Sequence, residues 1–256
     1  MLNKDILISV IMPAYNSGKF ISESIQSVLN QSYQNFEILI VDDASSDNTQ
    51  DIVNGFKDDR IIYMRNDVNR GVGYSRNVAA KSARGEYLAF LDSDDIWEKD
   101  KLQIQLDLSA STNCKFCFTG SAFMDEKGTK KEYILNVPEK IDVERLYKQN
   151  IISCSSVLIE KELYLRHKMS EERGLLHEDF LAWISVLKEV DYARGINKPL
   201  LVYRLYDSSK SANKFKAFRM NWNTFRKSGM SLFKAGYEMV FYAINGLKKY
   251  SSIYKG

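Results

Sequence analysis

The chain has 256 residues, 45% hydrophobic and 27% charged, a composition typical of a globular protein that excludes a wholly disordered chain. Three cysteines are too few for a disulfide framework and no apolar signal segment opens the sequence, so we expect a cytoplasmic protein. The net charge of +3 conceals an asymmetry, because residues 210–256 hold ten Lys or Arg and one acid, which leaves 26 basic and 32 acidic residues elsewhere.

The first 91 residues alternate between short apolar runs and helical segments. We expect buried strands at the four apolar runs, over residues 6–12, 36–41, 61–64 and 87–91. Between them we expect helices over residues 19–30, 47–56 and 73–82. Such alternation predicts an α/β fold with a Rossmann-like, mostly parallel central sheet and helices on both faces.

The pattern loosens after residue 119. We expect an edge strand at 131–135, a short helix at 143–148, a strand at 156–159 and a longer helix at 178–189. Two further strands are expected, one near Tyr192 and one at 200–203. Cys114 and Cys117 form a C-x-x-C pair, but two further zinc ligands at suitable spacing are lacking. We interpret these cysteines as packing residues of a strand.

Polar residues follow three of the predicted strands, where ligands bind in open sheets of this kind. They are Pro13, Tyr15 and Asn16 after the first strand, Asp42 and Asp43 after the second, and Asp92, Ser93, Asp94 and Asp95 after the fourth. Three carboxylates within four positions repel one another unless a cation lies among them, and Mg²⁺ or Mn²⁺ prefers such oxygen ligands. Asp42 and Asp43 suit hydrogen bonds from a nucleobase and ribose, with a solvated loop as the alternative.

Glycines precede the third predicted helix, in the segment 69–77. Gly71 allows the backbone to approach a ligand closely, and the start of the helix favours an anion. Arg76 would then point toward a base or a phosphate. This segment is not a dinucleotide-binding fingerprint, because that motif follows the first strand of its fold.

These residues, taken in order, resemble glycosyltransferase family 2, whose catalytic domain has the GT-A fold. The four matching motifs lie within the first 110 residues and are Pro13-Ala14-Tyr15-Asn16, Val41 to Asp47, Asn69 to Asn77, and Phe90 to Asp95 with Trp97. The resemblance implies a nucleotide-sugar donor, commonly a UDP-sugar, with the uracil near Asp42 and Arg76. It also implies a metal on Asp94, supported by Asp92 or Asp95. Ala44 departs from the family, which usually has Gly there.

The resemblance further implies an inverting transfer, with its base in a Glu-Asp pair that opens a helix in the second half. Here that pair is Glu178-Asp179, and we predict Asp179 as the group that takes the proton from the acceptor hydroxyl. The alternative is that both acids only complement the positive end of their helix. Family members often carry Tyr-Arg-x-His where this chain has Tyr203 to Tyr206, and we place Arg204 in the site.

An amphipathic helix is predicted in the basic tail. Its apolar residues recur at spacings of three and four, at Phe233, Tyr237, Val240, Phe241, Ile244 and Leu247. No apolar stretch approaches the roughly 20 residues of a spanning helix, so we expect the tail to lie on a membrane surface. Packing of the helix on the catalytic domain is the alternative. Nucleic acid is not expected as a partner, since no nucleic-acid motif accompanies the charge.

The sequence thus predicts a catalytic domain at 1–210, with a nucleotide-sugar half at about 1–110 and an acceptor half at about 111–210, followed by the helical tail at 211–256. The predicted function is metal-dependent transfer from a UDP-sugar to a saccharide hydroxyl, including one on a polyprenyl lipid, in bacterial surface polysaccharide synthesis. A peripheral place on the inner face of the cell membrane would suit it. The alternatives are a catalytically silent nucleotide-binding module and a metal-dependent nucleotidyl transferase. The sequence does not specify the sugar, the acceptor or the oligomeric state.

Overall fold

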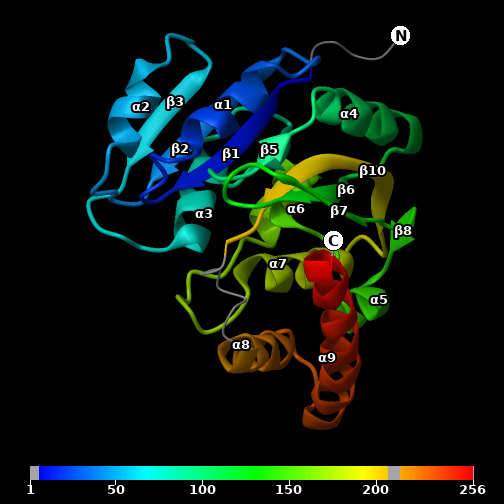
Figure 1. The fold of residues 1–256 in the computed structure, drawn as a ribbon. Helices are drawn as coiled ribbons and strands as arrows, with labels where there is room; N and C mark the ends of the chain where they lie inside the picture. Colours follow the sequence, from blue (N-terminus) through cyan, green and yellow to red (C-terminus); the bar gives the residue numbers. More distant parts are fainter. Residues whose placement is uncertain (1–5, 207–213, 256) are drawn as a thin grey trace.

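The computed structural model describes residues 6–206 and 214–255, with the side chains of the last two helices described over residues 216–246. Within these residues ten strands form one sheet in the order β3-β2-β1-β4-β9-β6-β10-β5, with β7 beside β6 and β8 beside β10 (Figure 1). The predicted α/β fold with helices on both faces is confirmed.

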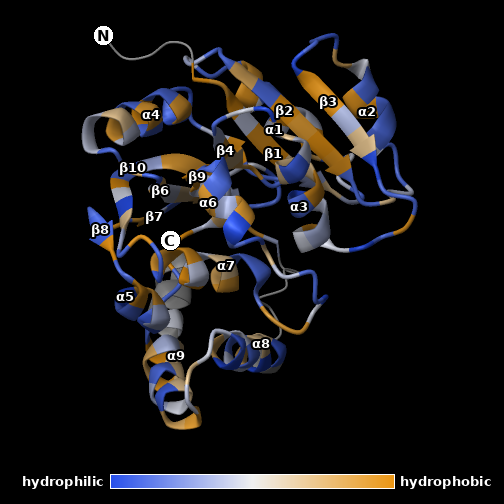
Figure 2. Ribbon diagram, turned by 180° about the vertical axis from the view of Figure 1, so that it is seen from behind, coloured by the Kyte–Doolittle hydropathy of each residue, from blue (hydrophilic) through white to orange (hydrophobic). Residues whose placement is uncertain are grey.

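The first half of the sheet is parallel, as the sequence predicts. Its elements are β1 (Ile8–Ala14), α1 (Ile21–Leu29), β2 (Phe36–Asp42), α2 (Thr49–Gly55), β3 (Ile61–Arg65), α3 (Val72–Ser82) and β4 (Tyr87–Phe90). The ends differ from the predicted ones by no more than two residues. Apolar residues are frequent in these strands, as the orange of β1, β2 and β3 in Figure 2 shows.

Side chains of each strand alternate between two cores, one on each face of the sheet. Ile11 and Phe90 pack on one face with α3, α6 (Lys161–Arg166) and α7 (Glu178–Leu187). Val10 packs on the other face with α1, α2 and α4 (Lys101–Thr112). With helices on both faces, the carboxyl edge of the parallel strands is left to the loops.

The second half of the sheet is mixed. It contains β5 (Ile96–Trp97), β6 (Phe116–Met124), β7 (Lys130–Leu135), β8 (Lys140–Ile141), β9 (Leu158–Glu160) and β10 (Ala193–Arg204), with helix α5 (Val143–Lys148) and a 3₁₀ turn (Cys154–Ser156). The prediction of two separate strands near Tyr192 and at 200–203 is wrong, because β10 is one strand. Register shifts on either side of Pro199 break its apolar pattern. Cys117 is buried in β6, where it packs as predicted.

Two helices close the chain, α8 (Lys214–Lys227) and α9 (Leu232–Lys255). Helix α8 lies within the helical tail predicted at 211–256, although a helix separate from α9 was not predicted there. Its Phe225 is buried against Phe180 of α7. The side chain of Leu247 and the predicted domain boundary at 210/211 lie outside the described residues. Among the helices that the structure describes, none has the length and apolar character needed to span a bilayer.

Candidate active site

A cavity of about 510 Å³ opens at the carboxyl ends of β1, β2 and β4. Seven of the predicted site residues line it: Pro13, Tyr15, Asn16, Asp43, Asp92, Ser93 and Asp94. Phe20, Val72 and Tyr206 complete its apolar and aromatic walls. The three polar loops that the sequence places at one edge of the sheet therefore meet around one cavity.

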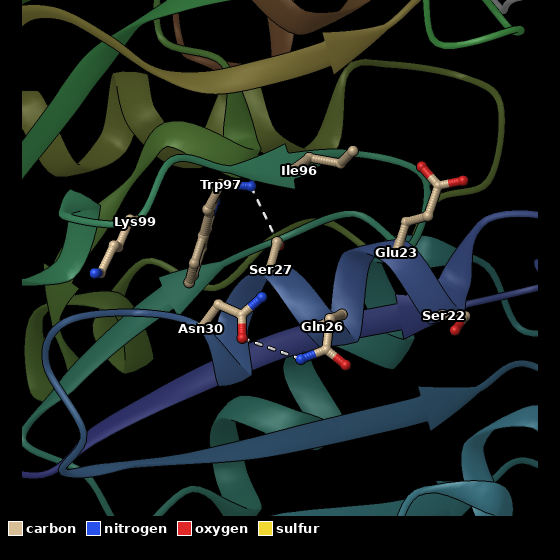
Figure 3. A pocket seen from close by; sticks show the side chains of 8 residues that line it. All are labelled: Ser22, Glu23, Gln26, Ser27, Asn30, Ile96, Trp97 and Lys99. Atoms are coloured by element: carbon tan, nitrogen blue, oxygen red, sulfur yellow. Dashed lines mark hydrogen bonds between the residues drawn. The ribbon is translucent and has the colours of Figure 1, made fainter.

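A larger groove of about 800 Å³ lies between α1 and β5 (Figure 3). Its one carboxylate, Glu23, already accepts a hydrogen bond from Nη2 of Arg204 at 2.7 Å. The amide of Gln26 donates to Asn30 on the same helix at 3.1 Å. The cavity at the carboxyl edge is lined by three carboxylates, whereas the groove between α1 and β5 has only one. We therefore place the candidate site in the cavity at the carboxyl edge.

Hydrogen bonds hold the loop after β1 against the two other loops. The backbone N–H of Asn16 donates to Oγ of Ser45 at 2.9 Å, and Oδ1 of Asn16 accepts from the backbone N–H of Ser46 at 2.8 Å. The hydroxyls of Ser17 and Ser93 lie 2.7 Å apart and join this loop to the acidic loop. Asn16 therefore acts as a connector between loops, in a left-handed conformation that Asn tolerates (φ 48°).

Asp42 does not face the cavity, which corrects its predicted role in contacting the base. Its side chain is fully buried and accepts hydrogen bonds from Arg65 Nη1 at 2.8 Å and from the Tyr63 hydroxyl at 2.5 Å. Burial, together with this hydrogen bond, raises the pKa of Tyr63 to about 12. The alternative of a solvated loop is wrong for Asp42 as well, since the carboxylate is paired inside the fold.

Asp43 does line the cavity and fixes the start of α3. Its Oδ2 accepts from the backbone N–H of Gly71 at 2.6 Å, and its Oδ1 accepts from the backbone N–H of Arg70 at 2.8 Å. Gly71 has a φ of 96°, a conformation that a side chain would strain. The neighbouring Ala44 has a φ of 62°, so the family's usual Gly would avoid a cost of about 1 kcal/mol.

Arg76 lies between the acidic loop and α7, which corrects the prediction that it points toward a base or phosphate. Its guanidinium is buried, with Nη2 at 2.5 Å from Oδ1 of Asp92 and Nη1 at 3.4 Å from Oε1 of Glu178. These two carboxylates come from opposite halves of the chain. Arg76 therefore joins the predicted metal loop to the predicted base helix.

The acidic loop holds two partly buried carboxylates, Asp92 and Asp94, and one buried carboxylate, Asp95. Asp92 and Asp94 both line the cavity, and Oδ2 of Asp94 accepts a hydrogen bond from the hydroxyl of Tyr206 at 2.8 Å. Burial and the charge of Asp92 raise the pKa of Asp94. Tyr206 was not among the predicted site residues, although its place where the family usually has His was a signal for it.

Asp95 and Arg204 support the acidic loop from behind. Asp95 is buried, and its Oδ1 accepts from the backbone N–H of Arg204 at 3.0 Å. The Arg204 side chain is also buried, and its Nε donates to the carbonyl of Asp94 at 2.9 Å. Neither residue lines the cavity, so the roles of Asp95 as a metal ligand and of Arg204 as a donor-binding residue stay predictions.

Glu178 and Asp179 open α7, at the place where the sequence predicts them. Burial, and then the charge of Glu178, raise the pKa of Asp179. A carboxylate with a raised pKa is a stronger base than an exposed one. The ion pair through Arg76 links this acid pair to Asp92 across the site.

The residues present fit a divalent cation only when it is shared with a ligand. No group of three or more His, Cys, Asp or Glu side chains in the described part of the chain could hold a metal by itself. Asp92 and Asp94 supply two carboxylates on the cavity wall. Mg²⁺ is commonly bound in this way, through one or two carboxylates together with substrate phosphates and water.

The strand order and the site at the carboxyl edge are those of a GT-A glycosyltransferase fold. The structure of S. aureus TarS (residues 1–349) in complex with UDP-GlcNAc superposes with a TM-score of 0.69 at 20% identity, over 91% of this chain and 70% of that one. The profile of "Glycosyl transferase family 2" matches residues 9–164.

Two curated relatives match over nearly the whole length. A protein of Bacillus subtilis (strain 168), named as the teichuronic acid biosynthesis glycosyltransferase TuaG, is 38% identical over 97% of this chain and 99% of its own. The Escherichia coli protein WfgD, named as a UDP-Glc:alpha-D-GlcNAc-diphosphoundecaprenol beta-1,3-glucosyltransferase, is 35% identical over 98% of both chains. The chain therefore belongs to glycosyltransferase family 2 and is a glycosyltransferase.

Proposed function

We propose that this enzyme transfers a sugar from a UDP-sugar to a hydroxyl of a saccharide carried on a polyprenyl diphosphate, in the synthesis of a bacterial surface polysaccharide. The observation that carries the proposal is the cavity at the carboxyl edge, which Asp92 and Asp94 line. Arg76 pairs with Asp92 on one side and with Glu178, of the acid pair of α7, on the other. The name of the WfgD relative supports both the UDP-sugar and the lipid-linked acceptor.

The donor would bind in the cavity between the loops after β1 and β2 and the acidic loop. Pro13, Tyr15 and Asn16 form one wall of this cavity, and Asp43 with the start of α3 forms another. Asp94 and Asp92 would hold Mn²⁺ or Mg²⁺ together with the donor diphosphate. The cation would supply positive charge for the leaving nucleoside diphosphate.

Asp179 would accept the proton of the acceptor hydroxyl as that oxygen attacks the anomeric carbon with inversion. Its raised pKa suits this role, because the carboxylate then holds the proton more firmly. Glu178 is fixed by Arg76 and adds the negative charge that keeps the pKa of Asp179 high. The cell location proposed with this chemistry is the cytoplasm, peripheral on the inner face of the membrane that carries the acceptor.

A donor screen tests the proposal. The purified enzyme is incubated with UDP-sugars and GDP-sugars, Mn²⁺ and a polyprenyl-diphosphate saccharide, and the released nucleotide is measured. We expect UDP release that depends on Mn²⁺ and on the acceptor. Pyrophosphate as the product would indicate a nucleotidyl transferase. A Mn²⁺-dependent thermal shift with UDP but no turnover would indicate a catalytically silent nucleotide-binding module. Absence of both the shift and the turnover across all donors would contradict the proposal.

Replacing Arg76 should damage turnover because it removes the link between the two halves of the site. We expect Arg76→Gln to lower kcat by about 10- to 100-fold, since small displacements of catalytic groups have effects of this size. Arg76→Lys should recover part of kcat. The measurement is kcat and KM for the acceptor, with the thermal midpoint as a check on folding.

Arg84 offers a matched control for Arg76. It also pairs with a buried carboxylate, that of Glu37 at 2.7 Å, but it precedes β4 and Glu37 lies at the start of β2, remote from the carboxyl edge. Arg84→Gln should lower the thermal midpoint and leave kcat unchanged. Equal kcat values for Arg76→Gln and the wild type would contradict the role given to Arg76.

A further inference from the structure

The outward side of α9 is apolar and exposed. We call this set the outer face of α9, and it consists of Phe233, Tyr237, Val240, Phe241 and Ile244. Their exposed fractions run from 36% to 92%. Spacings of three and four residues place them along one side of the helix. The rings of Tyr237 and Phe241 lie 4.8 Å apart, so the aromatic part of the face is continuous.

The opposite side of α9 already packs on the domain. Ala235 and Met239 are buried in the core, and the ring of Tyr242 lies 5.7 Å from that of Phe180. Packing on the domain, one of the two sequence alternatives, therefore holds for the inner side of α9 and leaves the outer face exposed. A side chain such as Phe233, at 92% exposure, is costly to leave in water unless a partner covers it.

Basic residues outnumber acidic ones on the two closing helices. Helix α8 carries five basic residues and no acidic ones within Lys214–Lys227, and its Phe218 is half exposed. The acid of α9, Glu238, is buried on the inner side. Lys234 lies beside the outer face, where its ammonium pairs with Glu144 at 2.7 Å. An exposed apolar face with basic surroundings is typical of helices that lie in the interface of anionic membranes.

Helices α8 and α9 project from the domain below the sheet in Figure 1. The start of α8 at Lys214 is eight residues from Tyr206, which lines the cavity, and eight residues span at most about 29 Å. A surface bound by these helices would thus be close to the candidate site. A second copy of this chain is a poorer occupant, because two basic α8 helices brought together would repel each other.

We propose that the outer face of α9, with the basic residues of α8, docks the enzyme on an anionic phospholipid surface. The proposal rests on the proposed function for its purpose, which is to bring the cavity to an acceptor anchored in the same membrane. The docking itself needs neither donor nor acceptor, so it can be measured apart from catalysis.

The test is sedimentation of the full-length protein with vesicles of phosphatidylcholine, with and without phosphatidylglycerol. We expect binding to the anionic vesicles that weakens with added salt. The double variant Tyr237→Glu and Phe241→Glu should reduce the binding at least about tenfold, because burial of a single large apolar side chain has an effect of that size. The thermal midpoint should stay unchanged, since both side chains are exposed.

Tyr192→Glu is the control, because Tyr192 has a similar exposed fraction to Phe241 and the substitution adds the same charge per site, but Tyr192 lies just before the first residue of β10 and belongs to neither helix. It should bind vesicles as the wild type does. Transfer to a water-soluble acceptor should be unaffected in the double variant, whereas transfer to a vesicle-embedded acceptor should fall. Absence of binding to anionic vesicles, or a solution dimer that the double variant abolishes, would overturn the proposal.

Discussion

Asp94→Asn should reduce UDP release by at least about 100-fold, the largest loss we expect from a single change in the acidic loop. The substitution keeps the size of the side chain and its ability to accept the hydrogen bond from Tyr206. It removes the charge that would hold the cation and, with it, the diphosphate. The measurement is kcat/KM across a Mn²⁺ titration, together with the Mn²⁺-dependent thermal shift in the presence of UDP, which should disappear.

Asp95→Asn is the control for this change, since Asp95 is the adjacent acid and does not line the cavity. An Asn at this position can still accept from the backbone N–H of Arg204. Burial and the charge of Asp94 raise the pKa of Asp95, so a neutral side chain is compatible with its surroundings. We expect the Mn²⁺ dependence to persist in this variant. If Asp95→Asn lost the Mn²⁺ dependence and Asp94→Asn kept it, the assignment of the metal to Asp94 would be wrong.

The parallel half of the fold was predictable because its strands are continuous apolar runs bounded by polar loops. Chain order alone then brings the loops after β1, β2 and β4 to one edge. The mixed half was less predictable. The strand β5 has two residues, and the register shifts around Pro199 hide the continuity of β10.

The direction of each charged side chain was the part that the sequence could not specify. Asp42 and Arg65 are 23 residues apart, and only the pairing of β2 with β3 makes them register partners. Arg76 and Glu178 meet across 102 residues. A motif indicates which residues gather at the site, but the packing decides whether a carboxylate faces the cavity or a neighbouring guanidinium.

Asp179→Asn should lower kcat by about 100- to 10,000-fold, the range that a general base contributes. Asn has nearly the same shape but cannot take the proton of the acceptor hydroxyl. Binding of UDP with Mn²⁺ should be unchanged, because Asp179 lies on α7 and does not line the cavity. The measurements are single-turnover rates with acceptor and the dissociation constant of UDP. Retained transfer in Asp179→Asn, with loss in Glu178→Gln, would make Glu178 the base.

The pH dependence should identify the base independently. Burial and the charge of Glu178 raise the pKa of Asp179, so kcat should fall as the pH drops through a value above that of an ordinary Asp. Glu178→Gln removes one cause of the raised pKa and should move this acid limb to lower pH. A raised pKa in the folded state also means that stability is lost as the pH rises through it. Asp179→Asn cannot ionise and should therefore unfold at the same or a higher temperature than the wild type at neutral pH, so that lost activity cannot be ascribed to a lost fold.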